Sequence, residues 1–325
     1  MEKTKKKSIF KICIFLFVFV ICYVYASIVF LPKSKDDVGG SDYSNVESIK
    51  AEKKNSLDVI FYGNSDLSSA ISPLQLYYET GVKSYNQWLS AQTMNGVVMS
   101  VKKTLKRQKP KIIVLETDVI ATKNDLFNKY SKYELSNYLA PFLYKSRLKS
   151  LKVKDFITLP KPQKDFYKGY MLKTDICKRE SYDYMNKNEF GNVEIEKSIQ
   201  KKLDELVAIC KKRKIKLLFM ESPSPSTWNN KRHKVMKKYA DNNNIEFIDF
   251  NTQLEGFKFD QETYFRDNGN HLNIYGAVSV TNYIGKYIKN NFELEDRRGS
   301  NFCDWDKDSQ KYMEEIKQYY DSVIG

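Results

Sequence analysis

Residues 58–65 read DVIFYGNS, and the fold prediction starts from them. The segment opens with a short apolar run, which is typical of a strand buried on both faces of a parallel sheet. Gly63 ends the run, because glycine permits a tight exit from a strand. Asn64 and Ser65 follow where that strand would reach the edge of its sheet. The segment therefore predicts a buried strand with a hydroxyl at its carboxyl end.

On the C-terminal side of this segment, short apolar runs alternate with helical patterns. Val97, Val98, Val101 and Leu105, for example, recur at the spacing of one helix face. Further strands are expected at 83–86, 112–115, 215–220 and 245–250, and helices at 73–81, 94–108, 195–210, 231–242 and 274–288. This alternation predicts an α/β fold, with a parallel sheet covered by helices on both faces.

Two regions fall outside the alternation. Residues 119–192 are rich in Tyr, Phe, Lys and Asn and contain three prolines, and we interpret them as an insertion of helices and loops over the carboxyl edge of the sheet. Residues 294–325 form a charged C-terminal tail, in which a helix is expected from Asp306 to Tyr320.

The N-terminus predicts one transmembrane helix. Residues 12–31 are twenty residues without a charge, and they span roughly 30 Å as a helix, the thickness of a bilayer's hydrocarbon core. The lysines at 3–7 favour a cytoplasmic tail over residues 1–11. Residues 32–56 are then a polar tether, and the rest of the chain lies outside the cell. Val24-Tyr25-Ala26 is an alternative signal-peptidase site, but the apolar run continues past it, which favours an uncleaved anchor.

Charge and cysteine content narrow the partners. Residues 1–35 hold seven lysines and one glutamate, so 47 basic and 39 acidic residues lie beyond them, a balance of +8. A mildly basic domain suits an anionic envelope polymer or lipid, and without a basic-aromatic module we expect no nucleic-acid partner. The five cysteines show no metal-like spacing, so neither a metal nor another cofactor is expected, while one disulfide among Cys177, Cys210 and Cys303 remains possible.

Ser65 and His271 are the candidate catalytic residues. Ser65 would stand on the turn after the first strand with its hydroxyl exposed, as a nucleophile requires. A serine hydroxyl needs a base, and His271 follows Asp267 by four residues, so Asp267 could orient the imidazole as in a catalytic triad. The alternatives are a turn or helix cap at Asn64 and Ser65, and a capping histidine beside a helix start at Asn273. The other histidine, His233, lies among lysines and is expected at the solvated surface.

Glu116 and Asp118 follow the middle strand and are weaker candidates. Both would reach the edge of the sheet where ligands bind in open α/β folds. They either line a pocket or satisfy nearby N–H groups of the loop.

Taken together, four segments resemble the SGNH/GDSL hydrolase superfamily: Gly63–Ser65, Tyr85-Asn86, Lys109–Glu116, and Asp267–Asn273 with Gly276-Ala277. More narrowly, the chain resembles membrane-anchored SGNH-like proteins of Gram-positive envelopes, which include polysaccharide O-acetylation proteins and the teichoic acid D-alanine-transfer protein. The resemblance covers roughly 57–290. It implies a three-layer, flavodoxin-like domain over 57–293.

By this resemblance, Ser65 is the nucleophile, His271 the base and Asp267 its acid, although the family's usual acid position is occupied by Asn268. The family's oxyanion glycine and asparagine have no counterparts, since residues 86–90 lack glycine and Glu116-Thr117-Asp118 stands in the third motif. The Ser65 backbone N–H remains as a donor, with Asn86 or Gln92 as replacements.

The implied activity is an extracytoplasmic, serine-dependent acyl-ester enzyme. The resemblance favours O-acyl transfer, most simply O-acetyl transfer, to a cell-wall or exopolysaccharide acceptor, with a multi-spanning membrane protein delivering the acyl group. The alternatives are a carbohydrate esterase and a non-catalytic envelope binding or assembly protein.

Overall fold

The computed structural model describes residues 2–122, 129–178, 180–187, 189, 194–299 and 303–325. The chain divides into two compact units, one formed by residues 1–44 and 131–163 and the other by residues 45–130 and 164–325. The parts of the expected insertion at 123–128, 179, 188 and 190–193 lie outside the described residues.

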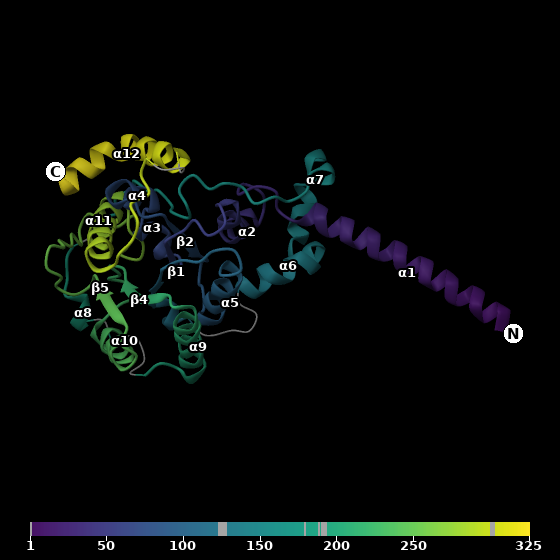
Figure 1. Ribbon diagram of the computed structural model, residues 1–325, viewed down its shortest axis with the longest axis horizontal. Coiled ribbons are helices and arrows are strands. Elements are labelled where there is room, and N and C mark those ends of the chain that lie inside the picture. Colours follow the sequence, from purple (N-terminus) through teal and green to yellow (C-terminus); the bar gives the residue numbers. More distant parts are fainter. Residues whose placement is uncertain (1, 123–128, 179, 188, 190–193, 300–302) are drawn as a thin grey trace. The chain divides into compact units, whose positions relative to one another are not determined.

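The larger unit is built on a five-stranded parallel sheet in the order β2-β1-β3-β4-β5 (Figure 1). Its strands are β1 (Val59–Gly63), β2 (Ser84–Trp88), β3 (Ile112–Glu116), β4 (Lys216–Glu221) and β5 (Glu246–Asp249). Each lies within two residues of its predicted position. The predicted parallel sheet is confirmed.

Helices cover both faces of this sheet, as predicted, because alternate strand residues point to opposite sides. The helices are α3 (Leu67–Ala70), α4 (Pro73–Thr80), α5 (Met94–Thr104), α9 (Lys197–Arg213), α10 (Asn230–Asn242) and α11 (Ile274–Asn291). Ile60 and Tyr62 belong to one core with residues of α5, α9 and α10, whereas Val59 and Phe61 belong to a second core with residues of α3 and α11.

The C-terminal segment contains the helix that the sequence predicted. This helix, α12 (Cys303–Ile324), packs on α4 and α11. Trp305, Tyr312 and Ile316 on this helix are buried in the core. An amphipathic helix with one apolar stripe packs on a domain even when most of its residues are charged.

Part of the expected tether is also folded. Residues 40–51 form α2 (Gly40–Glu47) and the 3₁₀ helix η1 (Ser48–Ala51). Ile49 joins the core of the larger unit, and Glu52 is buried and accepts a hydrogen bond from the Trp305 indole. The tether was predicted from the many polar residues of this segment. Its few apolar residues, such as Ile49, pack in the core of the larger unit and were overlooked.

The smaller unit contains α1 (Glu2–Phe30), most of α6 (Lys129–Leu143), the 3₁₀ helix η3 (Lys145–Lys149) and α7 (Val153–Ile157). α1 is long and apolar enough to cross a membrane, and it ends at Phe30. The same test is passed by a signal sequence, so the uncleaved anchor and its orientation stay predictions.

The expected insertion therefore divides between the two units. Residues 131–163 group with α1 and not with the sheet, so for them the expected position over the sheet edge stays a prediction. Residues 164–178 do remain with the sheet: the Met171 N–H donates to the Ser68 carbonyl and the Cys177 N–H to the Phe265 carbonyl. The remaining short elements are η2 (Thr117–Ala121) and α8 (Tyr184–Lys187).

Candidate active site

Ser65, His271 and Asp267 meet at the carboxyl edge of the sheet. The Ser65 Oγ lies 3.0 Å from the His271 Nε2, and the His271 Nδ1 lies 2.6 Å from the Asp267 Oδ2. These are hydrogen-bond distances in the order nucleophile, base and orienting acid. The structure thus brings together the three residues that the sequence analysis placed first, although the serine and the histidine lie 206 residues apart in the chain.

The turn after β1 sets the position of Ser65. A Cβ at Gly63 would lie 2.8 Å from the Glu116 Cβ and 2.9 Å from the Leu67 Cβ, so a larger residue cannot take this place without a shift of its neighbours. The Ser65 carbonyl accepts the Ser68 N–H as α3 begins. The strand therefore ends in a sharp turn that presents the serine at the sheet edge.

The loop that holds His271 is fixed on both sides. An antiparallel bridge joins Phe265 to Leu272, and the Arg266 N–H donates to the His271 carbonyl. Asn273 then caps α11 by accepting hydrogen bonds from the Tyr275 and Gly276 N–H groups. The prediction that Asn273 caps the last helix of the alternating pattern is confirmed, and this N-cap of α11 fixes the end of the loop that carries His271.

Asp267 is held as a carboxylate. Burial alone would raise its pKa, but hydrogen bonds from the His271 ring, the His271 N–H and the Asn270 N–H outweigh burial and lower the pKa to about 2. Hydrogen bonds to the charged form favour that form. The four-residue spacing in this sequence therefore supplies the acid that the family pattern places one residue later.

A second acid, Asp66, lies beside the same histidine and was missed in the sequence analysis. Its Oδ1 is 3.6 Å from the His271 Nε2, the nitrogen that faces Ser65. Burial raises the pKa of Asp66 well above its ordinary range, and the Asp118 and Asp267 carboxylates raise it further. The available signal was its position directly after Ser65 in the sequence.

The Asp118 and Glu116 side chains form a buried acidic row behind the triad. Asp118 accepts hydrogen bonds from the Asn64 amide at 2.8 Å and from Arg232 at 3.2 Å. Burial raises the pKa of Glu116 well above its usual range, and Asp66 and Asp118 add to the shift. The partners of Asp118 are thus side chains and not N–H groups of its own loop, and the alternatives for Glu116 and Asp118 stay predictions.

The two predicted replacement donors have other contacts. The Asn86 amide donates to the Ile71 carbonyl at 2.7 Å, and Asn86 pairs with Phe61, two residues before Gly63. Gln92 is buried, and its Oε1 accepts the Thr93 N–H. These hydrogen bonds of Asn86 and Gln92 go to groups other than Ser65.

The prediction for His233 is wrong. Its side chain is three-quarters buried, its Nδ1 lies 2.6 Å from the Asp249 Oδ2, and its ring stacks on Phe247. The sequence concealed this contact, because the neighbours of His233 along the chain are exposed lysines whereas its partner Asp249 lies on β5.

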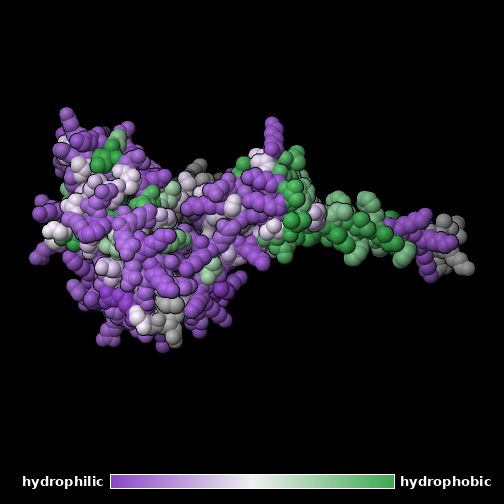
Figure 2. Space-filling view, turned by 90° about the horizontal axis from the view of Figure 1, so that it is seen from above, coloured by the Kyte–Doolittle hydropathy of each residue, from purple (hydrophilic) through white to green (hydrophobic). Residues whose placement is uncertain are grey.

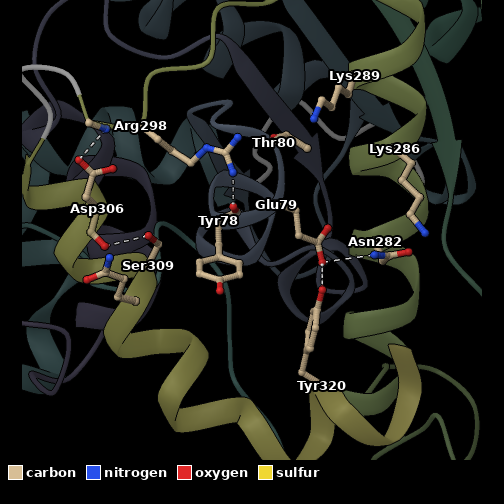
Figure 3. A pocket seen from close by; sticks show the side chains of 12 residues that line it. Tyr78, Glu79, Thr80, Asn282, Lys286, Lys289, Arg298, Asp306, Ser309 and Tyr320 are labelled. Carbon is tan, nitrogen blue, oxygen red and sulfur yellow. Dashed lines mark hydrogen bonds between the residues drawn. The ribbon is translucent and has the colours of Figure 1, made fainter. Parts of the chain in front are cut away.

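A cavity of about 830 Å³ lies between α4, α11 and α12 (Figure 3). The Glu79 carboxylate there accepts hydrogen bonds from Asn282 and Tyr320. None of the three triad residues lines this cavity, so it is separate from the candidate active site.

Among the described residues, no cluster of His, Cys, Asp and Glu side chains is arranged to hold a metal ion. Cys177 and Cys210 are free thiols, and burial raises the pKa of Cys210 to about 12.

No family model and no curated protein matches the chain. Solved structures resemble it in fold, among them a GDSL-like lipase from Bacteroides thetaiotaomicron (12% identity, 77% of this chain, 100% of that chain, TM-score 0.41). Another is a lipase/acylhydrolase from Enterococcus faecalis (11% identity, 74% of this chain, 98% of that chain, TM-score 0.40). At these values the likeness carries no argument about function, which rests on the geometry of the site.

Proposed function

We propose that the chain is a serine-dependent acyl-ester enzyme that transfers an O-acyl group to a cell-envelope polysaccharide through an acyl-Ser65 intermediate. The observation that carries the proposal is the continuous contact from the Ser65 hydroxyl through His271 to an ionised Asp267. A serine, a neutral imidazole and a carboxylate in this order make the hydroxyl nucleophilic near neutral pH.

In the first half-reaction, the Ser65 Oγ attacks the acyl carbonyl and its proton passes to the His271 Nε2. The bond between the acyl carbon and the leaving alcohol breaks, and the His271 proton goes to that alcohol. In the second half-reaction, an acceptor hydroxyl gives its proton to His271 and attacks the acyl-serine, and Ser65 leaves and recovers the proton. The acceptor is a sugar hydroxyl in transfer and water in hydrolysis.

Each half-reaction passes through an oxyanion that needs hydrogen-bond donors. The Ser65 N–H is one candidate. Asp66 is the second, because its buried carboxyl lies on the Ser65 side of the imidazole and burial raises its pKa, which favours the protonated form. A carboxyl in this state donates an O–H hydrogen bond, which an ionised carboxylate cannot do.

The proposed location is the outer face of the cell membrane, with α1 as an uncleaved anchor. It is supported by the length and apolarity of α1 and by the lysines that precede its apolar run. A polysaccharide acceptor and a multi-spanning membrane donor of the acyl group are parts of the same proposal.

The test is intact mass spectrometry of the full chain in detergent after incubation with an activated acetyl ester. Transfer chemistry predicts that one acetyl group stays on the parent protein until an oligosaccharide acceptor is added. Ser65→Ala should form no adduct, and His271→Ala should form it slowly. Free acetate without an acceptor, abolished in both variants, would indicate an esterase. Neither adduct nor acetate from the parent would contradict the proposed enzyme.

A further inference from the structure

The outer end of α1 is enclosed by other parts of its own unit. The Tyr23 hydroxyl donates to the Tyr138 carbonyl on α6 at 2.6 Å, and the Tyr25 hydroxyl donates to the Phe156 carbonyl on α7 at 3.0 Å. Five residues between 27 and 33 are buried: Ser27, Val29, Leu31, Pro32 and Lys33. The end of α1 therefore packs against α6, η3 and α7 of its own unit, and we call these three elements the collar.

A buried arginine holds this collar together. Arg147 is only 1% exposed, and it donates to the Phe30 carbonyl at 3.1 Å and to Asp155 at 2.8 Å. Asp37 lies 3.5 Å from the same guanidinium. These contacts join the last residue of α1 to the turn that follows it, to η3 and to α7.

The outward face of the collar is apolar. Its helices and the segment after α7 expose large hydrophobic side chains, with Val153 80% and Ile157 81% exposed. We call the following set the apolar collar: Tyr138, Phe142, Leu148, Val153, Ile157 and Leu159. Figure 2 shows hydrophobic residues continuing from α1 onto the adjoining helices. A soluble protein rarely leaves such a patch facing water.

The position of this surface suits a membrane interface. α1 is long and apolar enough to cross a membrane, and its exposed apolar stretch reaches Tyr25, beside the contacts with α6 and α7. The apolar collar therefore lies next to the end of the apolar helix. Interfacial helices bury their apolar faces roughly 5–10 Å into a bilayer.

The charges around the apolar collar point to the kind of surface. Residues 140–163 contain five exposed lysines and no exposed acid, because the one acid, Asp155, is buried against Arg147. The lysines are Lys145, Lys149, Lys152, Lys154 and Lys161. Lysines next to an interfacial apolar face are attracted to anionic lipid headgroups.

We propose that the apolar collar inserts into the outer interface of an anionic bilayer, beside the membrane-spanning helix α1. Because the collar is hydrogen-bonded to α1, insertion fixes the depth and tilt of the helix as well as anchoring it. This inference does not depend on the proposed acyl-ester activity.

The test places a tryptophan reporter in the apolar collar. Full-length Ile157→Trp is reconstituted in vesicles of phosphatidylglycerol and phosphatidylcholine with brominated acyl chains, and fluorescence quenching is measured. Tyr78→Trp is the matched control, since Tyr78 is an exposed residue of the larger unit. The three native tryptophans give the same background in both variants because all are buried: Trp88, Trp228 and Trp305.

The proposal predicts that brominated lipid quenches the reporter of Ile157→Trp severalfold more than that of the control, with less quenching by aqueous acrylamide. Equal access to acrylamide in both variants would overturn it, because the collar would then face water. Protection from lipid and acrylamide alike would also overturn it, because a protein would then cover the collar.

A second experiment reads the same contact without a fluorophore. A double variant, Ile157→Asp with Leu159→Asp, changes exposed positions only, so the fold should persist. In vesicles, trypsin should cut at Lys152 and Lys154 severalfold faster in this variant than in the parent. Identical cleavage rates for parent and variant would show that the bilayer does not shield the collar.

Discussion

Two histidine–aspartate pairs with the same primary contact lie in the larger unit. In both pairs an Nδ1 lies 2.6 Å from an aspartate Oδ2. His271 has Ser65 at its other nitrogen, whereas His233 stacks on Phe247. The partners differ as well: Asp267 is 38% exposed and Asp249 2% exposed.

The acids show what this difference means. Asp249 also accepts hydrogen bonds from the Trp228 indole and from the Asn251 backbone and side chain, so it ties three segments together after β4 and β5. Asp267 accepts hydrogen bonds from Asn270 and His271, which belong to its own loop. A short histidine–aspartate contact therefore identifies a catalytic pair only when a nucleophile lies at the second nitrogen.

The largest expected effect separates the two histidines. His271→Ala should lower kcat/KM for an activated acyl ester by about 10⁴-fold or more, because the base is lost. His233→Ala should leave the rate close to that of the parent, and it serves as the matched control. Comparable losses in both variants would contradict the assignment of His271 as the base.

The aspartates should differ in the quantity that each affects. Asp267→Asn should lower the rate by about 10³–10⁴-fold, since the imidazole loses its orienting carboxylate, with little change in the free energy of unfolding. Asp249→Asn should cost about 1–3 kcal/mol of stability, because an NH2 group replaces one of the two oxygens that accept from buried donors. Urea unfolding measures the stability of both variants and ester turnover measures their rates. Together they test whether one aspartate affects the rate and the other the stability. A catalytic loss in Asp249→Asn without destabilisation would contradict it.

The two pairs also show how far sequence reasoning reached. The strand, the tight exit at Gly63 and the Ser65–His271 pairing are local patterns placed at one sheet edge by the rules of parallel sheets, so they could be predicted. His233 was misjudged because its partner lies on β5, and its sequence neighbours are lysines. Asp66 was missed because its pKa depends on acids that only the fold brings near.

The same limit applies to larger segments. The tether and the tail were assigned from composition, whereas a few buried residues such as Ile49 and Trp305 decide whether such segments pack. Residues 131–163 could not be assigned to α1 from sequence, because their contacts with Tyr23 and Tyr25 are hydrogen bonds to backbone carbonyls, which any residue supplies.

Asp66 sharpens the comparison further, since among the described residues only the His271 pair has an acid at its second nitrogen. Asp66→Ala should lower the rate by about 10²-fold, the cost of one oxyanion donor. Asp66→Asn keeps an N–H donor and should retain more activity. Because the pKa of Asp66 is raised, the parent should lose activity as rising pH ionises this carboxyl, and Asp66→Asn should not show that loss. A pH profile of kcat/KM measures this, and an alkaline limb unchanged in Asp66→Asn would contradict the role.

The smallest expected effect concerns Glu221, a buried acid whose pKa is affected both by acids behind the triad and by Asp249 of the His233 pair. Burial raises its pKa well above the ordinary range, and Glu116, Asp118 and Asp249 raise it further. A folded-state pKa above the unfolded value means that the stability contributed at low pH is lost as the pH rises.

Glu221→Gln removes this titration and keeps the acceptor for the Thr117 hydroxyl, which lies 2.5 Å away. The variant should therefore be about 1–2 kcal/mol more stable than the parent at neutral pH. The gain should vanish toward pH 4, where the parent carboxyl is protonated in both states. Thermal unfolding across this pH range measures the difference. A variant that is no more stable than the parent at neutral pH would contradict this prediction. It would mean that contacts in the folded parent stabilise the ionised form of Glu221.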